Sequence, residues 1–156
     1  MQQNNQNIIR MRKRLFLLLL AFISLCQMNA VERTKLNFNG GWLLKVGDFP
    51  GAEQANYKDA GWKQITLPRA FNEKEAFKVS IEHLSDTIMW YRKHFHIQEV
   101  GDRKYFIEFE GVRFGADIWL NGKKVGYTEN GVMASGFDLT PYIIKGENVI
   151  AVRVDN

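Results

Sequence analysis

The stretch I-W-L-N-G-K-K-V-G at residues 118–126 places an Asn-Gly pair between two runs of β-forming residues. A type I′ turn requires positive φ at both of its central residues, and Asn followed by Gly tolerates this conformation best. Such a turn joins two antiparallel strands through only two residues. The stretch therefore predicts a β-hairpin that is closed by Asn121 and Gly122.

The chain beyond residue 31 repeats this β pattern and shows no long stretch with the 3.6-residue period of an amphipathic helix. Within 89–97, odd-numbered and even-numbered side chains would face opposite sides of a sheet. Residues 149–154 are apolar on both faces except at Arg153, which is typical of a strand inside a sandwich. The predicted strands are Lys35–Phe38, Trp42–Val46, Gln64–Leu67, Met89–Ile97, Lys104–Glu110, Ala116–Leu120, Lys124–Tyr127, Gly136–Leu139 and Asn148–Asp155. The fold class is therefore all-β.

Two stretches, Pro50–Trp62 and Arg69–Asp86, interrupt the series of strands. We predict that both are long loops, with a helical turn around residues 73–77. Long loops on a rigid β scaffold are common places for binding contacts.

The first thirty residues have the features of a secretory signal peptide. Basic residues that end at Arg14 precede the apolar run L-F-L-L-L-L-A-F-I at 15–23, and a polar and small-residue segment ends at Ala30. The apolar run is too short for a typical spanning helix. We predict cleavage after Ala30 and an exported domain, periplasmic or extracellular and free of the membrane, over 31–156. A lipoprotein signal at Cys26 is the less favoured alternative, since Leu25 stands where that signal requires a small residue.

The charge of the chain does not indicate a nucleic-acid partner. The formal net charge is +4, and removing the four basic residues of positions 1–30 from the total of 21 leaves 17 basic residues against 17 acidic ones. The two signs are interspersed, whereas a nucleic-acid interface requires clustered Lys and Arg. At 156 residues the chain has room for one domain and the export segment.

Several segments, in this order, resemble the sugar-binding N-terminal domain of glycoside hydrolase family 2. They are L-N-F-N-G-G-W (36–42), I-T-L-P (65–68), W-Y-R (90–92), F-E-G-V (109–112), A-D-I-W-L-N-G (116–122), V-G (125–126), F-D-L-T (137–140) and G-E-N-V-I-A-V-R-V-D-N (146–156). The resemblance implies a jelly-roll β-sandwich of the galactose-binding type over residues 31–156.

The same resemblance implies that this domain is a non-catalytic part of a galactosidase-like or glucuronidase-like enzyme. The catalytic carboxylates of the family lie on a downstream (β/α)₈ barrel, which needs about 250 residues. We therefore expect no catalytic residue, no metal and no cofactor in this chain. Its expected partners are the immunoglobulin-like and barrel domains of the parent enzyme and a carbohydrate.

The loop 128–135 is the candidate for a functional contact. In galactosidase-like relatives the loop that follows Val-Gly reaches toward the barrel and presents a polar side chain near the terminal sugar. By position this role falls to Asn130, with Glu129 beside it, since an amide or a carboxylate can bridge sugar hydroxyls. The alternative is an ordinary turn rich in Asn and Gly.

For the other residues that could carry a function, we expect structural roles. Glu73 follows Asn72 as in the acid/base pair of barrel glycosidases, but we expect an exposed loop residue. The pair His94 and His96 suggests a metal site, but without a third ligand we expect two residues on the sheet surface. The indoles expected in the core are Trp42, Trp90 and Trp119, while the place of Trp62 is left open.

Two rival functions remain at this stage. A free-standing carbohydrate-binding module would show an exposed aromatic platform, whereas a domain that supports a catalytic barrel would expose an apolar docking patch. A purely structural domain without sugar contact is the second rival.

Overall fold

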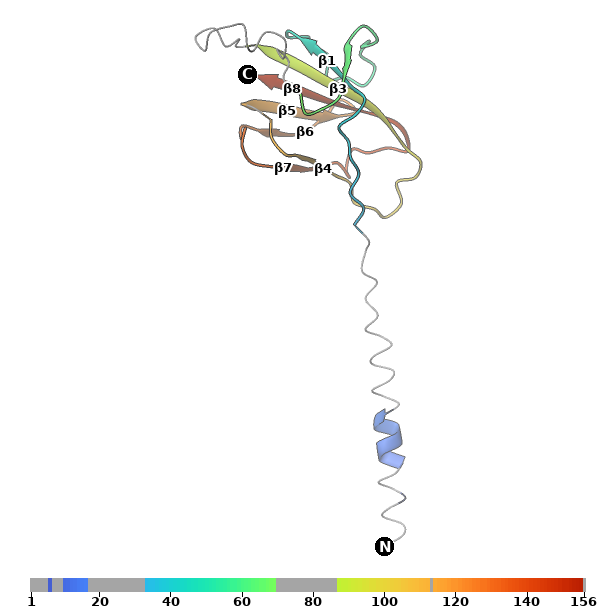
Figure 1. Cartoon of the computed structure of the whole chain (residues 1–156). Coiled ribbons are helices and arrows are strands. Elements are labelled where there is room, and N and C mark those ends of the chain that lie inside the picture. Colours follow the sequence, from blue (N-terminus) through green and yellow to red (C-terminus); the bar gives the residue numbers. More distant parts are fainter. Residues whose placement is uncertain (1–5, 7–9, 17–32, 70–86, 113, 156) are drawn as a thin grey trace. The chain divides into compact units, whose positions relative to one another are not determined.

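The computed structural model describes residues 6, 10–16, 33–69, 87–112 and 114–155 (Figure 1). It has a short helical segment at 10–16 and eight strands. The strands are β1 (Trp42–Val46), β2 (Lys63–Ile65), β3 (Ile88–Ile97), β4 (Phe106–Phe109), β5 (Gly115–Leu120), β6 (Lys123–Thr128), β7 (Ser135–Asp138) and β8 (Gly146–Asp155). The predicted all-β class is confirmed.

Met1–Leu36 and Asn37–Asn156 form separate compact units. The helical segment 10–16 belongs to the first unit and carries the basic residues of the predicted export signal. Most of the apolar run of this predicted signal, together with Cys26 and the cleavage position after Ala30, falls outside the described residues. Within the described ranges, no helix has the length and apolar character that a bilayer crossing requires.

The second unit is a sandwich of two antiparallel sheets. The larger sheet has the strand order β2-β1-β3-β8-β5-β6, and the smaller one pairs β4 with β7 (Figure 1). The ten-residue strands β3 and β8 pair along their whole length at the centre. Most residues of β8 are buried on both faces, as its apolar sequence predicted.

The main core lies between the two sheets. Ile118, Ile150 and Val152 of the large sheet pack with Ile107 of β4. At Gly126 a Cβ atom would lie 2.5 Å from the Phe137 ring, so the glycine permits the close approach of β6 and β7. The other buried members of this core are Trp42, Leu44, Ile65, Met89, Ala116, Leu120, Leu139, Ile143 and Val154.

Eight of the nine predicted strands are present, and Trp42–Val46 has the predicted bounds. The strand predicted at Lys35–Phe38 is wrong. The Phe38 carbonyl oxygen accepts hydrogen bonds from Trp42 Nε1 at 2.9 Å and from Lys93 Nζ at 2.8 Å. Two side chains therefore take the place of a neighbouring strand at the Phe38 carbonyl.

The predicted hairpin is confirmed. Leu120 pairs with Lys123, and the two residues between them have positive φ, 53° at Asn121 and 79° at Gly122. The Asn121 side chain also fixes the turn to β8, since its Oδ1 accepts from the Val149 N–H at 2.9 Å. Its Nδ2 donates to Oδ1 of the buried Asn148 at 2.8 Å.

We predict that Gly122→Val destabilises the domain by about 1 kcal/mol or more, because a β-branched residue is strained at this φ. The new Cβ would also lie 3.0 Å from Gln54 Oε1. The midpoint of thermal unfolding of the purified domain measures this loss of stability. Gly61→Val is the control, since Gly61 is outside the positive-φ region and has open space around its Cβ position. Equal midpoints for Gly122→Val and the parent protein would contradict the assigned turn.

Candidate functional site

The outer face of the large sheet carries a second, smaller core. Residues 50–62 contain no strand or helix, as predicted, but they lie over the sheet as a cover and do not project from it. Ala52 and Trp62 from this segment pack with Trp90 of β3 and Ala151 of β8. We call residues 50–62 the cover loop.

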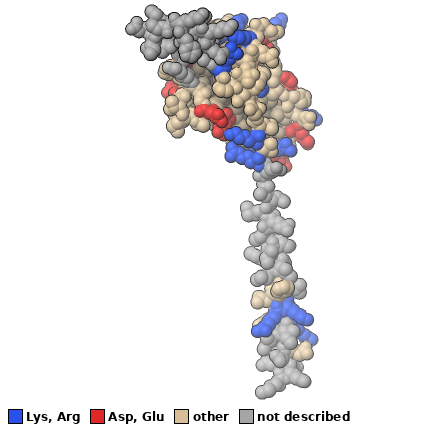
Figure 2. All heavy atoms as spheres, viewed as in Figure 1, with Lys and Arg blue, Asp and Glu red and all other residues tan. Residues whose placement is uncertain are grey.

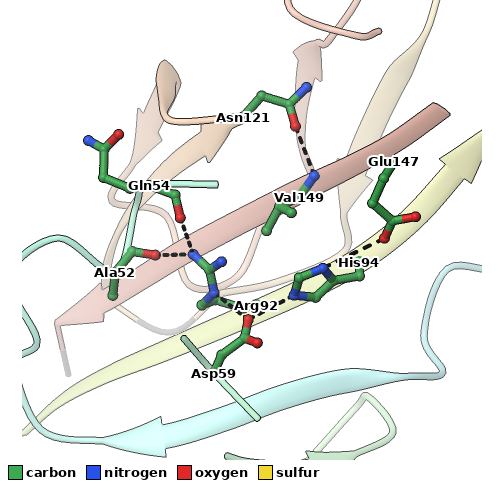
Figure 3. Close-up of polar contacts among 8 residues, drawn as sticks. All are labelled: Ala52, Gln54, Asp59, Arg92, His94, Asn121, Glu147 and Val149. Carbon is green, nitrogen blue, oxygen red and sulfur yellow. Dashed lines mark hydrogen bonds and ion pairs between the residues drawn. The ribbon is translucent and has the colours of Figure 1, made fainter. Parts of the chain in front are cut away.

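Arg92 of β3 is the polar centre beneath the cover loop and is fully buried (Figure 3). Its Nε donates to Asp59 Oδ2 at 2.7 Å, and its Nη1 donates to the carbonyl oxygens of Ala52 and Gln54. The Tyr57 ring lies 5.5 Å from the guanidinium carbon. A buried charge requires such partners, and one arginine thus bonds to three positions of the loop.

Asp59 accepts a second hydrogen bond on the same side of the sheet. His94 Nε2 lies 2.8 Å from Asp59 Oδ2, and His94 Nδ1 lies 3.6 Å from Glu147 Oε1 (Figure 3). Burial raises the pKa of Asp59, but the hydrogen bonds and charges of Arg92 and His94 outweigh it and hold this pKa below its ordinary value.

Asp48, which lies just before the cover loop, makes a second group of polar contacts with the sheet. Asp48 accepts hydrogen bonds from the Arg153 guanidinium at 3.1 and 3.2 Å and from Trp90 Nε1 at 3.2 Å. The hydrogen bond from Arg153 lowers the pKa of Asp48. Acidic and basic side chains occur together on the face seen in Figure 2, in agreement with the interspersed charges of the sequence.

His94 and His96 lie exposed on the sheet surface, as expected. Both approach the exposed Glu147 side chain, His96 Nδ1 at 4.0 Å. In the described part of the chain, no group of three or more His, Cys, Asp or Glu residues could hold a metal ion. Glu73 and the third histidine, His83, fall outside that part.

The four tryptophans form no exposed platform. The side chains of Trp42, Trp62 and Trp90 are buried, and the half-buried Trp119 ring stacks on Trp90 with centroids 5.4 Å apart. The packing role expected for Trp42, Trp90 and Trp119 is confirmed. Trp62, left open by the sequence, belongs to the smaller core.

The candidate loop 128–135 joins β6 to β7. Asn130 Oδ1 accepts hydrogen bonds from the N–H groups of Val132 and Met133, both at 3.1 Å, so this oxygen holds the turn itself. Glu129 Oε1 accepts from the Tyr127 hydroxyl at 2.8 Å, and this bond raises the pKa of Tyr127. Both candidate residues are exposed, which leaves the Asn130 amide group and the Glu129 carboxylate in a position to meet a ligand.

The connection between β4 and β5 lies next to this loop and was missed by the sequence reasoning. A Cβ atom at Gly111 would lie 3.3 Å from the Gly131 carbonyl oxygen. Phe114 is exposed and has φ 60°, which is rare for a bulky residue. A phenylalanine gives no sequence signal for a left-handed backbone, so this feature could be found only in the structure.

We predict that Asp59→Asn destabilises the domain by about 3 kcal/mol at pH 7, because the substitution removes the ionic partner of a buried arginine. Since folding lowers the pKa of Asp59, its stabilising contribution is complete above an unfolded pKa of about 4 and is lost as the pH falls through the folded value. The difference in the free energy of unfolding between Asp59→Asn and the parent protein should therefore become smaller below about pH 4.

Denaturant unfolding between pH 3 and pH 7 measures this difference. Asp102→Asn, at an exposed position away from Arg92, is the control and should unfold like the parent protein at every pH. A constant difference across the whole pH range would contradict the role of the Asp59 carboxylate.

Comparisons with known proteins connect this sandwich to one enzyme family. Residues 48–156 match the family model that is described as "Glycosyl hydrolases family 2, sugar binding domain". A β-glucuronidase of Formosa agariphila is 40% identical over an alignment of 134 residues, and the match covers 80% of this chain and 14% of that protein. A β-galactosidase of Bacteroides ovatus is 33% identical over an alignment of 132 residues, and the match covers 80% of this chain and 16% of that protein.

The solved structures agree with the sequence comparisons. A β-glucuronidase from glycoside hydrolase family 2 superposes with a TM-score of 0.74 at 36% identity, over 81% of this chain and 15% of the other. β-Glucuronidase 2 of Bacteroides uniformis gives a TM-score of 0.74 at 26% identity over 80% of this chain. The chain thus spans about one seventh of the length of these enzymes. It belongs to glycoside hydrolase family 2, as the sugar-binding domain that precedes the other domains of these hydrolases.

Proposed function

We propose that this chain is the exported N-terminal module of a family 2 enzyme, where it supports the catalytic domain and contributes the loop 128–135 to the sugar site. The observation that carries the proposal is the exposed pair Glu129 and Asn130 on a loop that its own hydrogen bonds hold in place. A side chain that is already ordered binds a ligand with a smaller loss of entropy.

The module does not itself supply the chemistry. Glycoside hydrolysis uses two carboxyl groups about 5 to 9.5 Å apart on either side of the scissile bond. In the family these groups belong to the downstream barrel, and the part of the relatives that this chain matches is their first domain. The module therefore acts on the sugar only together with the rest of the enzyme.

A β-glucuronide is the first substrate to test. The Formosa agariphila relative at 40% identity is a β-glucuronidase, and so is the structure at 36% identity. The Bacteroides ovatus β-galactosidase, at 33% identity over the same share of the chain, makes a β-galactoside the second substrate.

Export is supported by the basic residues on the helical segment 10–16 and by the apolar run that follows them. We predict that the exported protein begins at or near Val31. Intact mass and N-terminal sequencing of the secreted product measure this. A lipid-modified product that begins at Cys26, or one that retains residues 12–30, would contradict it.

The loop contact is tested in a chimera in which residues 31–156 replace the matched segment of the Formosa agariphila β-glucuronidase. Asn130→Asp keeps an oxygen for the N–H groups of Val132 and Met133 but removes the amide that faces a ligand. We expect the KM for a chromogenic β-glucuronide to rise about tenfold, the effect of losing about one hydrogen bond. Glu129→Gln should raise the KM for the same reason.

Asn37→Asp is the matched control, since Asn37 Oδ1 caps an exposed turn elsewhere by accepting from the Asn39 N–H. Its KM should equal that of the unmodified chimera. If Asn130→Asp and Glu129→Gln also left the KM unchanged, the loop would have no contact with the sugar.

We also predict that the isolated chain hydrolyses no glycoside and binds galactosides or glucuronides with dissociation constants of millimolar or weaker. A millimolar constant corresponds to about −4 kcal/mol, which a few solvent-exposed hydrogen bonds can supply. Calorimetric titration and a chromogenic assay measure both properties. Micromolar binding by the isolated chain would favour a free-standing carbohydrate-binding module.

A further inference from the structure

The chain contains three Asn-Gly pairs, at 39–40, 121–122 and 130–131. An asparagine that precedes glycine loses its side-chain amide readily without an enzyme, because glycine has no Cβ to shield its backbone nitrogen from the asparagine side chain. Asparagine belongs for this reason to the heat-labile residues of proteins. The three pairs share the same chemistry, so differences in their reactivity within the folded chain must come from the structure around them.

Deamidation of an Asn-Gly pair requires a side chain that is free to move. The backbone nitrogen of the glycine loses its proton and bonds to Cγ of the asparagine, while the Cγ–Nδ2 bond breaks and Nδ2 takes up a proton and leaves as ammonia. Water then opens the succinimide ring, at the side-chain carbonyl to give aspartate or at the main-chain carbonyl to give iso-aspartate. Because Cγ must first reach the nitrogen of the next residue, hydrogen bonds that hold the amide slow the reaction.

The Asn121 amide is held at both ends. Its Oδ1 accepts from the Val149 N–H at 2.9 Å (Figure 3). Its Nδ2 donates to the Tyr142 carbonyl oxygen at 3.0 Å and to Asn148 Oδ1 at 2.8 Å. The side chain can reach the Gly122 nitrogen only after these bonds break, which requires local opening of the turn. The fold therefore protects the Asn-Gly pair that closes the hairpin.

The Asn130 amide is held at one end. Its Oδ1 accepts from the N–H groups of Val132 and Met133, both at 3.1 Å, whereas no described residue accepts a hydrogen bond from its Nδ2. The group that leaves as ammonia is thus free, but the bonds to the carbonyl oxygen restrict rotation toward the Gly131 nitrogen. We expect an intermediate reactivity for this pair.

The Asn39 amide is held at neither end. The residue is exposed, and within the described ranges its side chain has no hydrogen-bond partner. Its main chain makes the bonds instead, since the N–H donates to Asn37 Oδ1 and the carbonyl oxygen accepts from the Leu67 N–H, both at 2.9 Å. Gly40 is also exposed, and open space surrounds the position of its missing Cβ. Solvent therefore reaches both partners of the reaction.

We propose that the Asn39-Gly40 pair is a site of spontaneous covalent modification, at which the folded chain deamidates to iso-aspartate and aspartate. The same fold protects the pair at 121–122 and slows the reaction of the pair at 130–131. The modification is independent of the proposed function, because residue 39 lies outside the loop 128–135.

Iso-aspartate at residue 39 weakens the attachment of the segment that precedes β1. The carbonyl oxygens of Phe38 and Gly40 both accept from Lys93 Nζ, at 2.8 and 2.5 Å. Iso-aspartate inserts one additional methylene into the main chain between these two carbonyls, so the same ammonium group no longer reaches both. The modified chain should therefore unfold at a lower temperature.

The test incubates the purified chain at mildly alkaline pH and follows each asparagine by peptide mapping with mass spectrometry. We expect the folded chain to lose the Asn39 amide at least about tenfold faster than the Asn121 amide, which reacts only from a locally opened state, with Asn130 between them. In concentrated urea, where the fold protects none of them, the three rates should agree within about threefold. Equal rates at Asn39 and Asn121 in the folded chain, or an Asn39 rate that rises about tenfold in urea, would overturn the proposal.

Two glycine variants test the chemistry. Gly40→Ala should slow the loss at Asn39 about tenfold, because the new Cβ shields the nitrogen, and the open space at this position lets the domain keep its unfolding midpoint. Gly61→Ala, at another glycine with open space around its Cβ position, is the matched control and should leave the Asn39 rate unchanged. An Asn39 rate that is the same in both variants would contradict attack by the Gly40 nitrogen.

A third variant separates the charge of the product from the change in its main chain. Asn39→Asp carries the new carboxylate without the additional methylene and should unfold at the midpoint of the parent protein. Chain that has been incubated until residue 39 is converted should contain a fraction that unfolds at a lower temperature than Asn39→Asp. If all of the converted chain unfolded together with Asn39→Asp, the proposed effect on the Lys93 bonds would be wrong.

Discussion

The buried guanidinium of Arg92 is the constraint on which the outer layer of this domain depends. A full charge without water must be compensated by hydrogen bonds, and here Asp59 and two carbonyl oxygens of the cover loop provide them. The hydrogen bonds from Nε and Nη1 of Arg92 therefore also hold a segment without regular secondary structure against β3, while Nη2 is buried without a hydrogen-bond partner among the described residues. Trp62 and Trp90 add apolar contacts around this polar centre.

The cover loop and the loop 128–135 differ in how they contact the rest of the domain. Ala52, Asp59 and Trp62 of the cover loop are buried and hold it against the large sheet. The loop 128–135 has the opposite character, because Asn130 bonds to its backbone while the side chains of residues 129–134 are exposed. Under the proposed function this difference has a purpose, because a module that supports a catalytic domain needs both a stable core and a surface for contact.

The sequence predicted the features that depend on local chemistry. The turn at Asn121 and Gly122 follows from their tolerance of positive φ, and the strands follow from alternation and apolar runs. It failed where side chains outside the segment decide the outcome, as at Lys35–Phe38, where Trp42 and the distant Lys93 donate to the Phe38 carbonyl that a neighbouring strand would have used. The cover loop was predicted as a loop, but its burial depends on Arg92, 30 or more positions away. The strained backbone of Phe114 has no local signal.

Amide hydrogen exchange of the isolated chain carrying Arg92→Met tests most directly whether Arg92 holds the cover loop and leaves the loop 128–135 unaffected. Local opening exposes the amides of a weakened segment without global unfolding. We predict that amides within residues 52–62 exchange about a hundredfold faster than in the parent protein, while those of Val132 and Met133 change less than about threefold. Uniform acceleration across the domain, or unchanged protection of the cover loop, would contradict the central role of Arg92.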